Sequence, residues 1–600
     1  MYRTVRLDEV VLEDDDFAPR RAAVKAYLQA FDLDRLLHTF RRQAGLPSDA
    51  MPLGGWEEEA CGLRGHFTGH FLSACARYAF ADDDAAMRAR VGRIVDVLAT
   101  CARADGYLSA FEETVLDTLE AEENRNVWAP YYTLHKILQG LVDAYRFTDN
   151  GQALEVAVNL AHYIRGRFRK LSFWKIDGIL RCTKVNPVNE FGGIGDALYS
   201  LHELTGDKEL LAFAMTFDRP YFLDNLTAGR DVLENLHANT HLPMILAAMH
   251  RYDLTGEPGI RQAVMHFLSF LEGRTFANGS NSSKATAFIP GQVSERSEHW
   301  GAYGDLHDAL TGGECESCCA HNTERMLEHA FAWTGDVRWL VWLEGLRYNA
   351  VLNSASISTG LSQYHQPLGE HVRKTFSRPY DDFWCCTGSG IEAMSELQKN
   401  IWLRAGDTLL MNLAVSSTLT WKEKGIRIEQ RSGFPDRAET VLTIRTERPV
   451  SFTLQWKAVS VRGVSMDGVP AALVEGNGFI SLTRDFQDGD VLVVSLAAER
   501  VEVPLPGDGE RRAVRVGPVL MAEVVTEPED AMPGAPSAAG DATGGNGGPI
   551  SGLAGLVPLF RVTSQPYTVY RKTAGACAGC ETAGRKPDDK AADGRAAYGC

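Results

Sequence analysis

The spacing of apolar residues changes once along the chain, near residue 405, and this change constrains the fold most strongly. Between residue 20 and about residue 350, apolar residues recur at i, i+3, i+4 and i+7, as in "ALEVAVNLAHYIRGRF" at 153–168. That period is typical of helices with one buried face. After about residue 405 the period becomes two, as in "AETVLTIRTERPVSFTLQWK", which indicates short strands. We therefore predict a mainly α protein whose C-terminal part is a β-sandwich.

A short motif recurs in the helical part where one helical segment gives way to the next. It reads "LTGD" at 204–207, "LTGE" at 254–257 and "WTGD" at 333–336, with "FTDN" at 147–150 as a degenerate copy. Glycine is a common C-cap, so each copy predicts the end of one helix and the start of another. Recurrent helical hairpins predict a closed α/α toroid or an α-solenoid. Long inserted loops favour the toroid, because loops gathered at one end of a barrel can build a site.

These patterns divide the chain of 600 residues into six expected segments. One of them is rich in Pro, Gly and Ala and poor in large apolar groups, which predicts a disordered linker. The segments are an N-terminal segment (1–20), a helical barrel (21–405), a β-sandwich (406–525), the linker (526–550), a return segment packing on the sandwich or barrel (551–572) and a disordered tail (573–600).

Charge and hydropathy narrow the classes of partner. The net charge is -17 and is spread along the chain, which argues against nucleic acid or an anionic membrane as a partner. The first residues lack the apolar stretch of a secretory signal, and no window approaches 18 uninterrupted apolar residues. We expect a cytoplasmic protein that acts on a small molecule, and a homodimer is compatible with the sequence.

Cysteines cluster in two places, although the chain has only 12 of them. Cys385 and Cys386 are adjacent in "DDFWCCTGSG", between an aromatic pair and a glycine-rich turn, and neighbouring cysteines rarely form a disulfide because the ring is strained. The stretch "GGECESCCAHNTERML" adds Glu314, Cys315, Glu316, Cys318 and Cys319. Such a set suits a tetrahedral zinc ion, and buried free thiols or redox chemistry are the alternatives.

The remaining cysteines carry weaker signals. Cys61, Cys75, Cys101 and Cys182 sit among apolar neighbours and are interpreted as small buried hydrophobes. Cys577 and Cys580 form a lone C-x-x-C in the predicted tail, and without a second pair they do not predict a zinc knuckle.

Carboxylates and histidines supply further candidates. "SERSEHWGAYGD" places Glu295, Glu298 and Asp305 among aromatic residues, where desolvation can raise the pKa of a carboxyl group into the range of a general acid. Histidines occur in "LRGHFTGHFLSA", "APYYTLHK" and "NLHANTHLPM", and a single histidine is most often structural. Here they accompany Trp56, Trp128, Asn239 and Tyr364, and rings with polar tips predict a pocket for a sugar-like molecule.

Several motifs, in this order, resemble those of the β-L-arabinofuranosidase group, glycoside hydrolase family 127 and its relative family 146. They are "LRGHFTGHFLSA", "VWAPYYTLHKILQGL", "HANTHLP", "SEHW", "ESC" and "FWCCTGSGIE", and the resemblance runs from about residue 5 to beyond residue 500, into "PLFRVTSQPYTVYR". It implies an (α/α)6 barrel followed by a β-sandwich. It also implies a retaining exo-glycosidase that releases terminal β-L-arabinofuranose from oligosaccharides or glycoconjugates.

The resemblance further implies roles for individual residues. Cys385 would be the nucleophile, and Glu298 would be the general acid and then the base. Zinc would be held by Glu316, Cys318, Cys385 and Cys386 and would keep the nucleophile as a thiolate at neutral pH. The sugar would be contacted by His66, His135, His237, His241 and Tyr364. This chain departs from the pattern by two extra thiols, Cys315 and Cys319, and by Glu314, a second candidate for the carboxylate ligand.

Two other functions are compatible with the residues. The first is a non-catalytic carbohydrate-binding protein in which zinc joins two barrel loops. The second is another (α/α)6 carbohydrate-active enzyme, such as a lyase or an unsaturated-uronide hydrolase, which would not need the thiol cluster.

Overall fold

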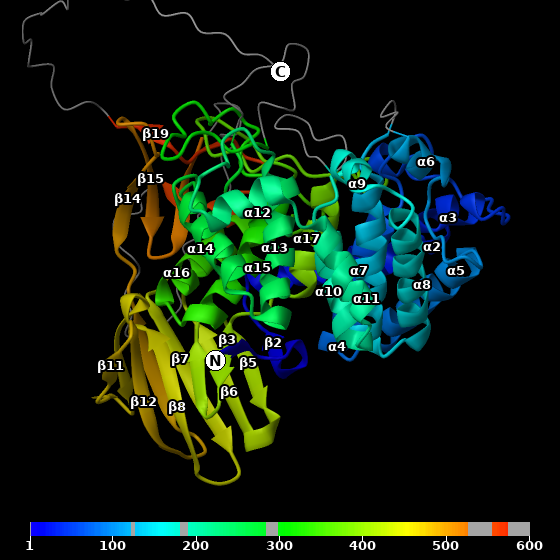
Figure 1. Cartoon of the computed structure of the whole chain (residues 1–600). Helices are drawn as coiled ribbons and strands as arrows, with labels where there is room; N and C mark the ends of the chain where they lie inside the picture. Colours follow the sequence, from blue (N-terminus) through cyan, green and yellow to red (C-terminus); the bar gives the residue numbers. More distant parts are fainter. Residues whose placement is uncertain (1, 122–126, 181–189, 284–297, 526–554, 574–600) are drawn as a thin grey trace, which may run out of the picture.

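The computed structural model places a ring of helices beside a stack of β-sheets (Figure 1). It describes residues 2–121, 127–180, 190–283, 298–525 and 555–573. The predicted linker, residues 574–600 of the predicted tail, and Cys182, Glu295, Cys577 and Cys580 lie outside the described residues. Within the described ranges, no helix has the length and apolar character needed to cross a membrane.

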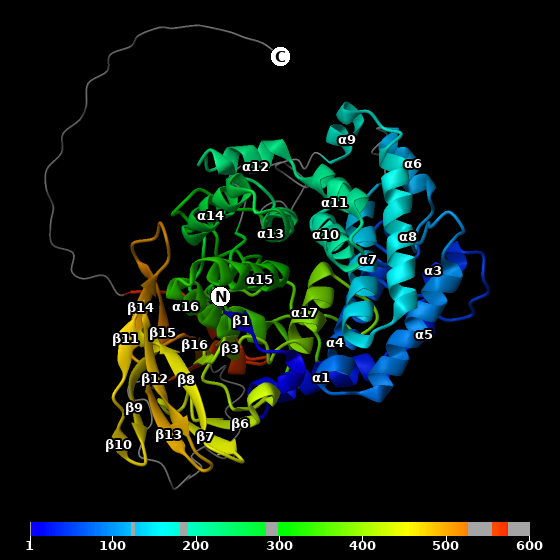
Figure 2. The ribbon, with the colours of Figure 1, turned by 60° about the horizontal axis from the view of Figure 1, so that its bottom comes forward.

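Six helices of the described chain form a closed inner ring. They are α4 (His66–Ala81), α7 (Pro130–Thr148), α10 (Ile194–Thr205), α13 (Ala238–Thr255), α15 (Ser317–Thr334) and α17 (Cys385–Ser395). Each contacts the next along the chain, and α17 contacts α4, so the ring closes on itself. Figure 2 shows these helices around a common centre. The fold is therefore the predicted toroid and not a solenoid.

A second layer of helices covers the ring from outside. Its members are α1 (Phe17–Ala30), α5 (Ala85–Cys101), α8 (Gly151–Phe168), α11 (Lys208–Ala214), α12 (Pro220–Thr227), α14 (Pro258–Glu272) and α16 (Val337–Leu346). All but α12 contact the inner helix that directly precedes them in the ring, and α12 packs on α14. Shorter helices lie in the connections: α2 (Leu33–Leu36), α3 (His38–Gln43), α6 (Thr114–Glu120) and α9 (Phe173–Ile179).

The repeated motif marks the turn from an inner helix to an outer one. Gly206, Gly256 and Gly335 are the C-caps of α10, α13 and α15, with φ of 73°, 68° and 66°. This left-handed conformation is accessible to glycine at little cost. The following Asp207 and Asp336 accept backbone N–H bonds as N-caps of α11 and α16. The C-cap prediction is confirmed, and each of these three copies forms the turn between the two helices of one hairpin.

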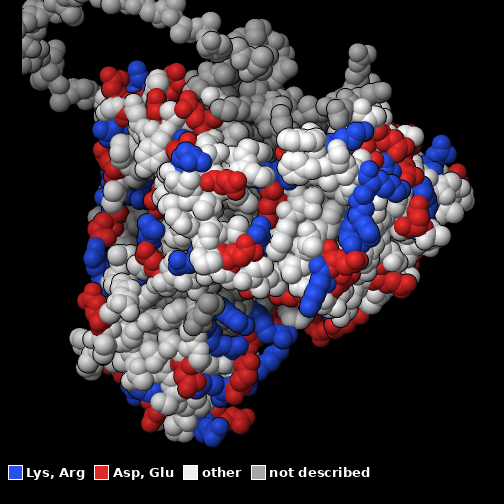
Figure 3. Space-filling model, viewed as in Figure 1, with Lys and Arg blue, Asp and Glu red and all other residues white. Residues whose placement is uncertain are grey.

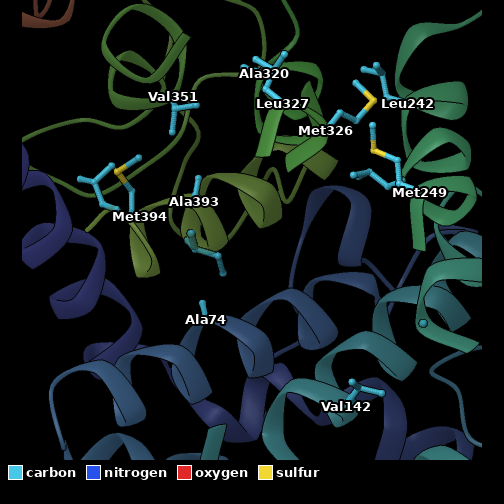
Figure 4. Close-up of a cluster of buried hydrophobic side chains, with 14 of the residues drawn as sticks. Ala74, Val142, Leu242, Met249, Ala320, Met326, Leu327, Val351, Ala393 and Met394 are labelled. Atoms are coloured by element: carbon cyan, nitrogen blue, oxygen red, sulfur yellow. The ribbon is translucent and has the colours of Figure 1, made fainter. Parts of the chain in front are cut away.

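Buried apolar side chains of the inner helices hold the ring together (Figure 4). Leu242, Met326 and Met394, from α13, α15 and α17, are among those with almost no exposed surface. Between α4 and α7 the backbones approach closely, because a Cβ at Gly69 would lie 2.0 Å from a carbonyl oxygen of α7. Such dense packing makes the ring a rigid support for side chains at its ends.

The described strands form three sheets in the β part. The first has the order β1 (Arg3–Thr4), β3 (Trp402–Ala405), β4 (Thr408–Met411), β8 (Val450–Lys457), β12 (Phe479–Phe486), β11 (Val474–Gly476). The second has the order β10 (Val469–Pro470), β9 (Val461–Met466), β13 (Val491–Leu496), β7 (Glu439–Thr446), β6 (Ile426–Ser432), β5 (Ser417–Trp421), β2 (Val10–Leu12). These two form the sandwich, with alternating burial along β6 and β7 as the period of two predicts.

The third sheet lies between the sandwich and the loops at one end of the barrel. It contains β14 (Arg500–Pro504), β15 (Arg511–Val516), β16 (Val519–Val524) and β17 (Leu556–Pro558), with β18 (Tyr567–Thr568) beside β16 and β19 (Arg571–Lys572) beside β15. Its Tyr567 and Tyr570 share a buried cluster with Phe276 and Leu368 from the barrel loops. The C-terminal strands thus support the loops on which the site is built.

Charged side chains of both signs are interspersed over the helices and sheets on the face shown in Figure 3. The chain has 78 acidic and 61 basic residues, so the excess of negative charge is a small difference between two large numbers. Among the residues coloured in this view, neither sign forms a continuous surface.

Candidate active site

Four candidate metal ligands lie at the N-termini of two neighbouring inner helices. Glu316 is the N-cap of α15 and Cys318 is in its first turn. Cys385 and Cys386 are the first two residues of α17. Helix N-termini present free N–H groups and a partial positive charge, which favour ionised carboxylates and thiolates. The fold therefore brings anionic ligands from two distant segments to one electropositive point.

The four ligand atoms form a compact, buried group. One oxygen or sulfur atom from each residue lies within 4.8 Å of all the others. The Sγ atoms of Cys385 and Cys386 are 3.8 Å apart, and Glu316 Oε1 lies 3.3 Å and 3.6 Å from them. A tetrahedral zinc ion with bonds of about 2.3 Å to sulfur and 2.0 Å to oxygen requires edges of about 3.8 Å and 3.5 Å. The donor set fits a tetrahedral metal ion.

The electrostatics of the cluster also favour a bound cation. Hydrogen bonds from Cys385 and Cys386 hold the pKa of the Cys318 thiol well below its usual value, although burial opposes this. The same contact with Cys318 raises the pKa of Cys385, and burial followed by the neighbouring Cys318 raises that of Glu316. Without a positive charge, one thiolate thus suppresses the ionisation of its neighbours. A metal ion would allow all four groups to ionise together.

The segment after the adjacent cysteines is helical, and the expected glycine-rich turn is absent from these described residues. Residues Cys385–Ser395 form α17. A Cβ at Gly388 would lie 2.2 Å from the His70 ring of α4, and one at Gly390 would lie 2.2 Å from Ser362 Oγ. The glycines therefore serve close packing of α17 against its neighbours, and sequence spacing alone could not distinguish this from a turn.

The rival residues Glu314 and Cys315 face away from the cluster. The Glu314 carboxylate accepts backbone N–H bonds from Thr311, Gly312 and Leu368, at 3.1, 2.7 and 2.7 Å. Cys315 has a φ of 57° and packs in the apolar cluster beside the third sheet. The carboxylate that joins the three thiols in the buried group is therefore Glu316. Cys319 contacts the other oxygen of Glu316 at 3.6 Å, behind the ligand atoms.

Glu298 lies between two histidines on adjacent loops. Its Oε2 is 3.1 Å from His237 Nε2 and its Oε1 is 3.5 Å from His365 Nε2. Burial alone would raise the pKa of Glu298, but the two histidines hold it well below the usual carboxyl value. The hydrogen bond to Glu298 in turn raises the pKa of His237 against the effect of burial. The Glu298 carboxyl group therefore favours its ionised form, and the adjacent His237 favours its protonated form.

The backbone around Glu298 is fixed in an uncommon conformation. Glu298 has a φ of 65°, and its carbonyl oxygen accepts the Ala238 N–H at 2.8 Å. Non-glycine residues in this region cost about 1–3 kcal/mol and persist where the surroundings impose them, often at functional sites. Phe383, two residues before Cys385, is also left-handed, with a φ of 49°. Both chemical groups are thus held by constrained loops.

The sequence-predicted sugar-binding residues divide into two groups. His66 Nδ1 is bonded to Leu63 O, whereas its buried Nε2 has no partner among the described residues. His135 Nδ1 is likewise buried and unpartnered there. His241 differs, because its two nitrogens are bonded to Tyr221 Oη at 2.9 Å and His237 O at 2.7 Å. Burial lowers the pKa of His241 to about 3, so it is a neutral structural residue.

Tyr364 packs directly against the thiol cluster. Together with Trp56 it covers the apolar surface formed by Cys318, Cys385 and Cys386. Burial raises the pKa of the Tyr364 phenol well above its usual value, so the hydroxyl stays protonated. The structure thus places Tyr364 where it can meet a molecule that approaches the thiols.

Three nearby residues were missed by sequence reasoning. His365 pairs with Glu298, Ser389 Oγ lies 3.1 Å from Cys318 Sγ, and Trp384 is the N-cap of α17. Ser389 also lines a polar cavity inside the ring together with Cys318 and His70. The only signal in the sequence was adjacency: His365 follows Tyr364 in "SQYHQP", and Trp384 precedes the two cysteines.

Two family models cover most of the chain. The β-L-arabinofuranosidase GH127 catalytic domain matches residues 9–399, and the GH127 middle domain matches residues 408–498. No curated protein sequence matches the chain.

Three solved structures are similar over nearly the whole length. A GH127 β-L-arabinofuranosidase from Geobacillus stearothermophilus T6 is 16% identical, with a TM-score of 0.66 over 94% of this chain and 99% of that one. A second GH127 β-arabinofuranosidase is 17% identical, with a TM-score of 0.65 over 87% and 85%. A third, described as a glycoside hydrolase, is 14% identical, with a TM-score of 0.67 over 95% and 98%. At these identities the likeness shows a common fold.

Proposed function

Because the chain belongs to the β-L-arabinofuranosidase family GH127, a family of glycoside hydrolases, we propose that it is a retaining exo-glycosidase for terminal β-L-arabinofuranose. The observation that carries this proposal is the juxtaposition of a buried carboxylate and three thiols at two helix N-termini. Its substrates would be oligosaccharides or glycoconjugates. Residues 21–405 would form the catalytic domain.

In the first step, Cys385 Sγ would attack the anomeric carbon. The new S–C bond forms as the glycosidic C–O bond breaks, and the proton shared by Glu298 and His237 passes to the departing oxygen through the Glu298 carboxyl. The Glu298–His237 distance of 3.1 Å allows the histidine to replace that proton. The leaving sugar thus departs as a neutral alcohol.

In the second step, water would release the sugar from the cysteine. Glu298, now ionised, would take a proton from the water. The water oxygen bonds to the anomeric carbon as the C–S bond breaks. Two inversions give net retention of configuration. The same carboxyl acts as acid and then as base.

We propose Glu316, Cys318, Cys385 and Cys386 as ligands of a zinc ion. When bound, the cation would keep these thiols ionised and stabilise the thiolate that leaves in the second step. Ser389 would orient Cys318 by its hydrogen bond of 3.1 Å to the sulfur. These roles use the donor set as the structure presents it.

The sugar would be held by groups that keep an unused hydrogen-bonding atom. His66 and His135 each have a buried ring nitrogen without a partner among the described residues, and these suit sugar hydroxyls. Tyr364 would pack on the ring, and His237 would contact the sugar beside Glu298. His241 would hold His237 in place, because His241 Nδ1 is bonded to the backbone carbonyl oxygen of His237.

The test is a panel of aryl glycosides assayed with and without a chelator, with metal analysis of the same samples. We expect release from the β-L-arabinofuranoside, loss of activity after chelation and recovery with Zn²⁺. Saccharide binding without hydrolysis would favour the zinc-stapled binding protein. Turnover of uronides that survives chelation would favour another (α/α)6 enzyme, and no release from any pentofuranoside would refute the proposal.

A further inference from the structure

A continuous run of aromatic rings leads from the thiol cluster to the protein surface. Trp384 immediately precedes Cys385, and its ring centroid is 5.5 Å from that of Tyr364. Tyr364 is followed by Trp56 at 6.0 Å, and Trp56 by Trp128 at 4.9 Å, with interplanar angles of 82° and 74°. Trp128 is 37% exposed. The four rings, which we call the aromatic run, join the proposed nucleophile to solvent.

The aromatic run is built on loops that are tied to one another. The backbone N–H of Trp56 donates to the backbone carbonyl oxygen of Asp382 at 2.9 Å. This bond links the loop of Trp56 to the segment before Cys385. Gly55 has a φ of 59°, and a Cβ there would lie 2.3 Å from that same carbonyl oxygen. A Cβ at Gly62 would lie 3.0 Å from the Cβ of Trp128. The glycines allow these close approaches, and the rings are held in place before any ligand arrives.

The loop of Trp56 is also fixed to the inner ring. The buried Glu57 accepts the Gly65 N–H at 2.6 Å and the Phe67 N–H at 2.7 Å, at the start of α4. Its Oε1 is also 2.9 Å from His66 Nδ1. Trp56 is therefore anchored on both sides, by α4 and by the segment before α17. A fixed ring loses little entropy when it binds a ligand.

We propose that the aromatic run is the binding site for the sugar unit on the leaving-group side of the glycosidic bond. This rests on the proposed function. An exo-acting enzyme encloses the terminal sugar, so only the leaving-group part of the substrate extends to solvent. The run starts at the proposed nucleophile and ends at an exposed tryptophan, which is the path that this part must follow. The substrate class is then a furanoside linked to a second sugar.

The chemistry of the surroundings favours a sugar over a purely apolar group. The exposed Glu58 lies two residues after Trp56, and the exposed Asp381 lies three residues before Trp384. A sugar ring has an apolar face of C–H groups that packs on aromatic rings, and a polar edge that bonds to carboxylates. The aromatic run bordered by acidic groups offers a partner for both. An alkyl chain would offer no hydroxyl groups to Glu58 and Asp381.

The experiment compares two leaving groups in the same enzyme. The substrates are methyl β-L-arabinofuranoside and a disaccharide in which the same terminal sugar is linked to a second sugar. For Trp128→Ala we expect kcat/KM on the disaccharide to fall roughly tenfold, mainly through KM, as the loss of a stacking contact implies. The value for the methyl glycoside should stay within about twofold. Trp128→Phe should recover most of the loss on the disaccharide.

The matched control is Trp174→Ala, because Trp174 is 78% exposed and lies outside the aromatic run. It should leave both substrates unchanged. Equal losses for Trp128→Ala and Trp174→Ala, or no loss for Trp128→Ala on the disaccharide, would overturn the inference. So would a larger loss on an octyl glycoside than on the disaccharide. A wild-type enzyme that cleaves no arabinofuranoside would instead refute the proposed function, which separates the two failures.

Discussion

Two neighbouring pairs of residues, Glu314–Cys315 and Glu316–Cys318, offer the same chemical groups, yet the structure gives them opposite surroundings. The Glu314 carboxylate is occupied by three backbone N–H groups, and Cys315 is packed among apolar side chains. Glu316 and Cys318 face two further thiols from α17. The left-handed backbone at Cys315 and the start of α15 separate the two pairs. Local conformation therefore decides which pair faces the thiols of α17, in a segment whose composition alone allows either pair.

The strongest test of this comparison replaces a cysteine by serine in two places. One is in the buried group that contains Glu316, and the other is in the Glu314–Cys315 pair. Cys385→Ser should lower kcat by roughly 10⁴-fold or more, because a hydroxyl at that position is neither ionised nor comparably nucleophilic. Cys315→Ser, the matched control, should retain turnover within a few-fold. Steady-state kinetics on an aryl β-L-arabinofuranoside measures both, and wild-type turnover by Cys385→Ser would exclude it as the nucleophile.

A third carboxylate, Glu298, extends the comparison to a group held by histidines. Glu298→Gln should slow the natural saccharide by about 10²–10⁴-fold, the usual contribution of a general acid. It should slow the first step for an activated aryl glycoside far less, because that leaving group departs without a proton. Pre-steady-state rates on both substrates check this. Equal losses on the two would count against Glu298 as the acid.

The two carboxylates Glu316 and Glu314 can be compared directly by amide substitution. Glu316→Gln should lower both metal content and activity, by more than the 10–100-fold typical of a change outside the ligand set. Glu314→Gln should keep the metal and lose only about 1–3 kcal/mol of stability, because it disturbs buried backbone hydrogen bonds. Metal analysis and thermal unfolding of both variants would show this. Metal loss in Glu314→Gln alone would reverse the assignment.

A smaller effect concerns pH, through the proton held between Glu298 and His237. The pKa of Glu298 is lowered and that of His237 is raised, so the pair keeps one proton until the pH rises through the histidine pKa. kcat/KM for the natural saccharide should therefore fall on the alkaline side, above the ordinary histidine value of about 6.5.

When both His237 and His365 are replaced by Gln, the proton can reside only on the carboxyl group of Glu298. The alkaline limb should then move down toward the carboxyl range of about 4–5, with roughly tenfold lower activity at neutral pH. An activated aryl glycoside serves as the control, since its first step needs no proton. A limb that stays in place when both histidines are replaced would show that they do not supply the proton.

The sequence predicted the toroid and the sandwich because both depend on regular patterns. The spacing of apolar residues and the glycine of each "TG" motif act locally, so the helix ends at Gly206, Gly256 and Gly335 could be anticipated. Two features could not be. The N-terminal strands pair with β3 and β5, about 400 residues away, through backbone bonds that leave no pattern in three residues. The helix at "CCTGSG" depends on packing against His70, which only the tertiary structure supplies.

The candidate site likewise contains residues that the sequence predicted and residues that it did not. The resemblance brought Glu316, Cys318, Cys385 and Cys386 together as one set, and the structure places them within 4.8 Å. His365 and Ser389 were not foreseen, because their importance lies in distances of 3.5 Å and 3.1 Å to groups on other segments. The structural role of His241 depends likewise on Tyr221, twenty residues before it.

If the group containing Glu316 and Cys318 positions Cys385 to form a bond with the sugar, that bond can be detected on the enzyme. The most direct measurement uses Glu298→Gln with an activated aryl β-L-arabinofuranoside, acid quenching and peptide mass mapping. Without a base to activate water, the sugar should accumulate on the enzyme. The peptide that contains Cys385 should carry the added mass of one anhydropentose. An adduct on any other residue, or continued aryl release with no adduct at all, would contradict it.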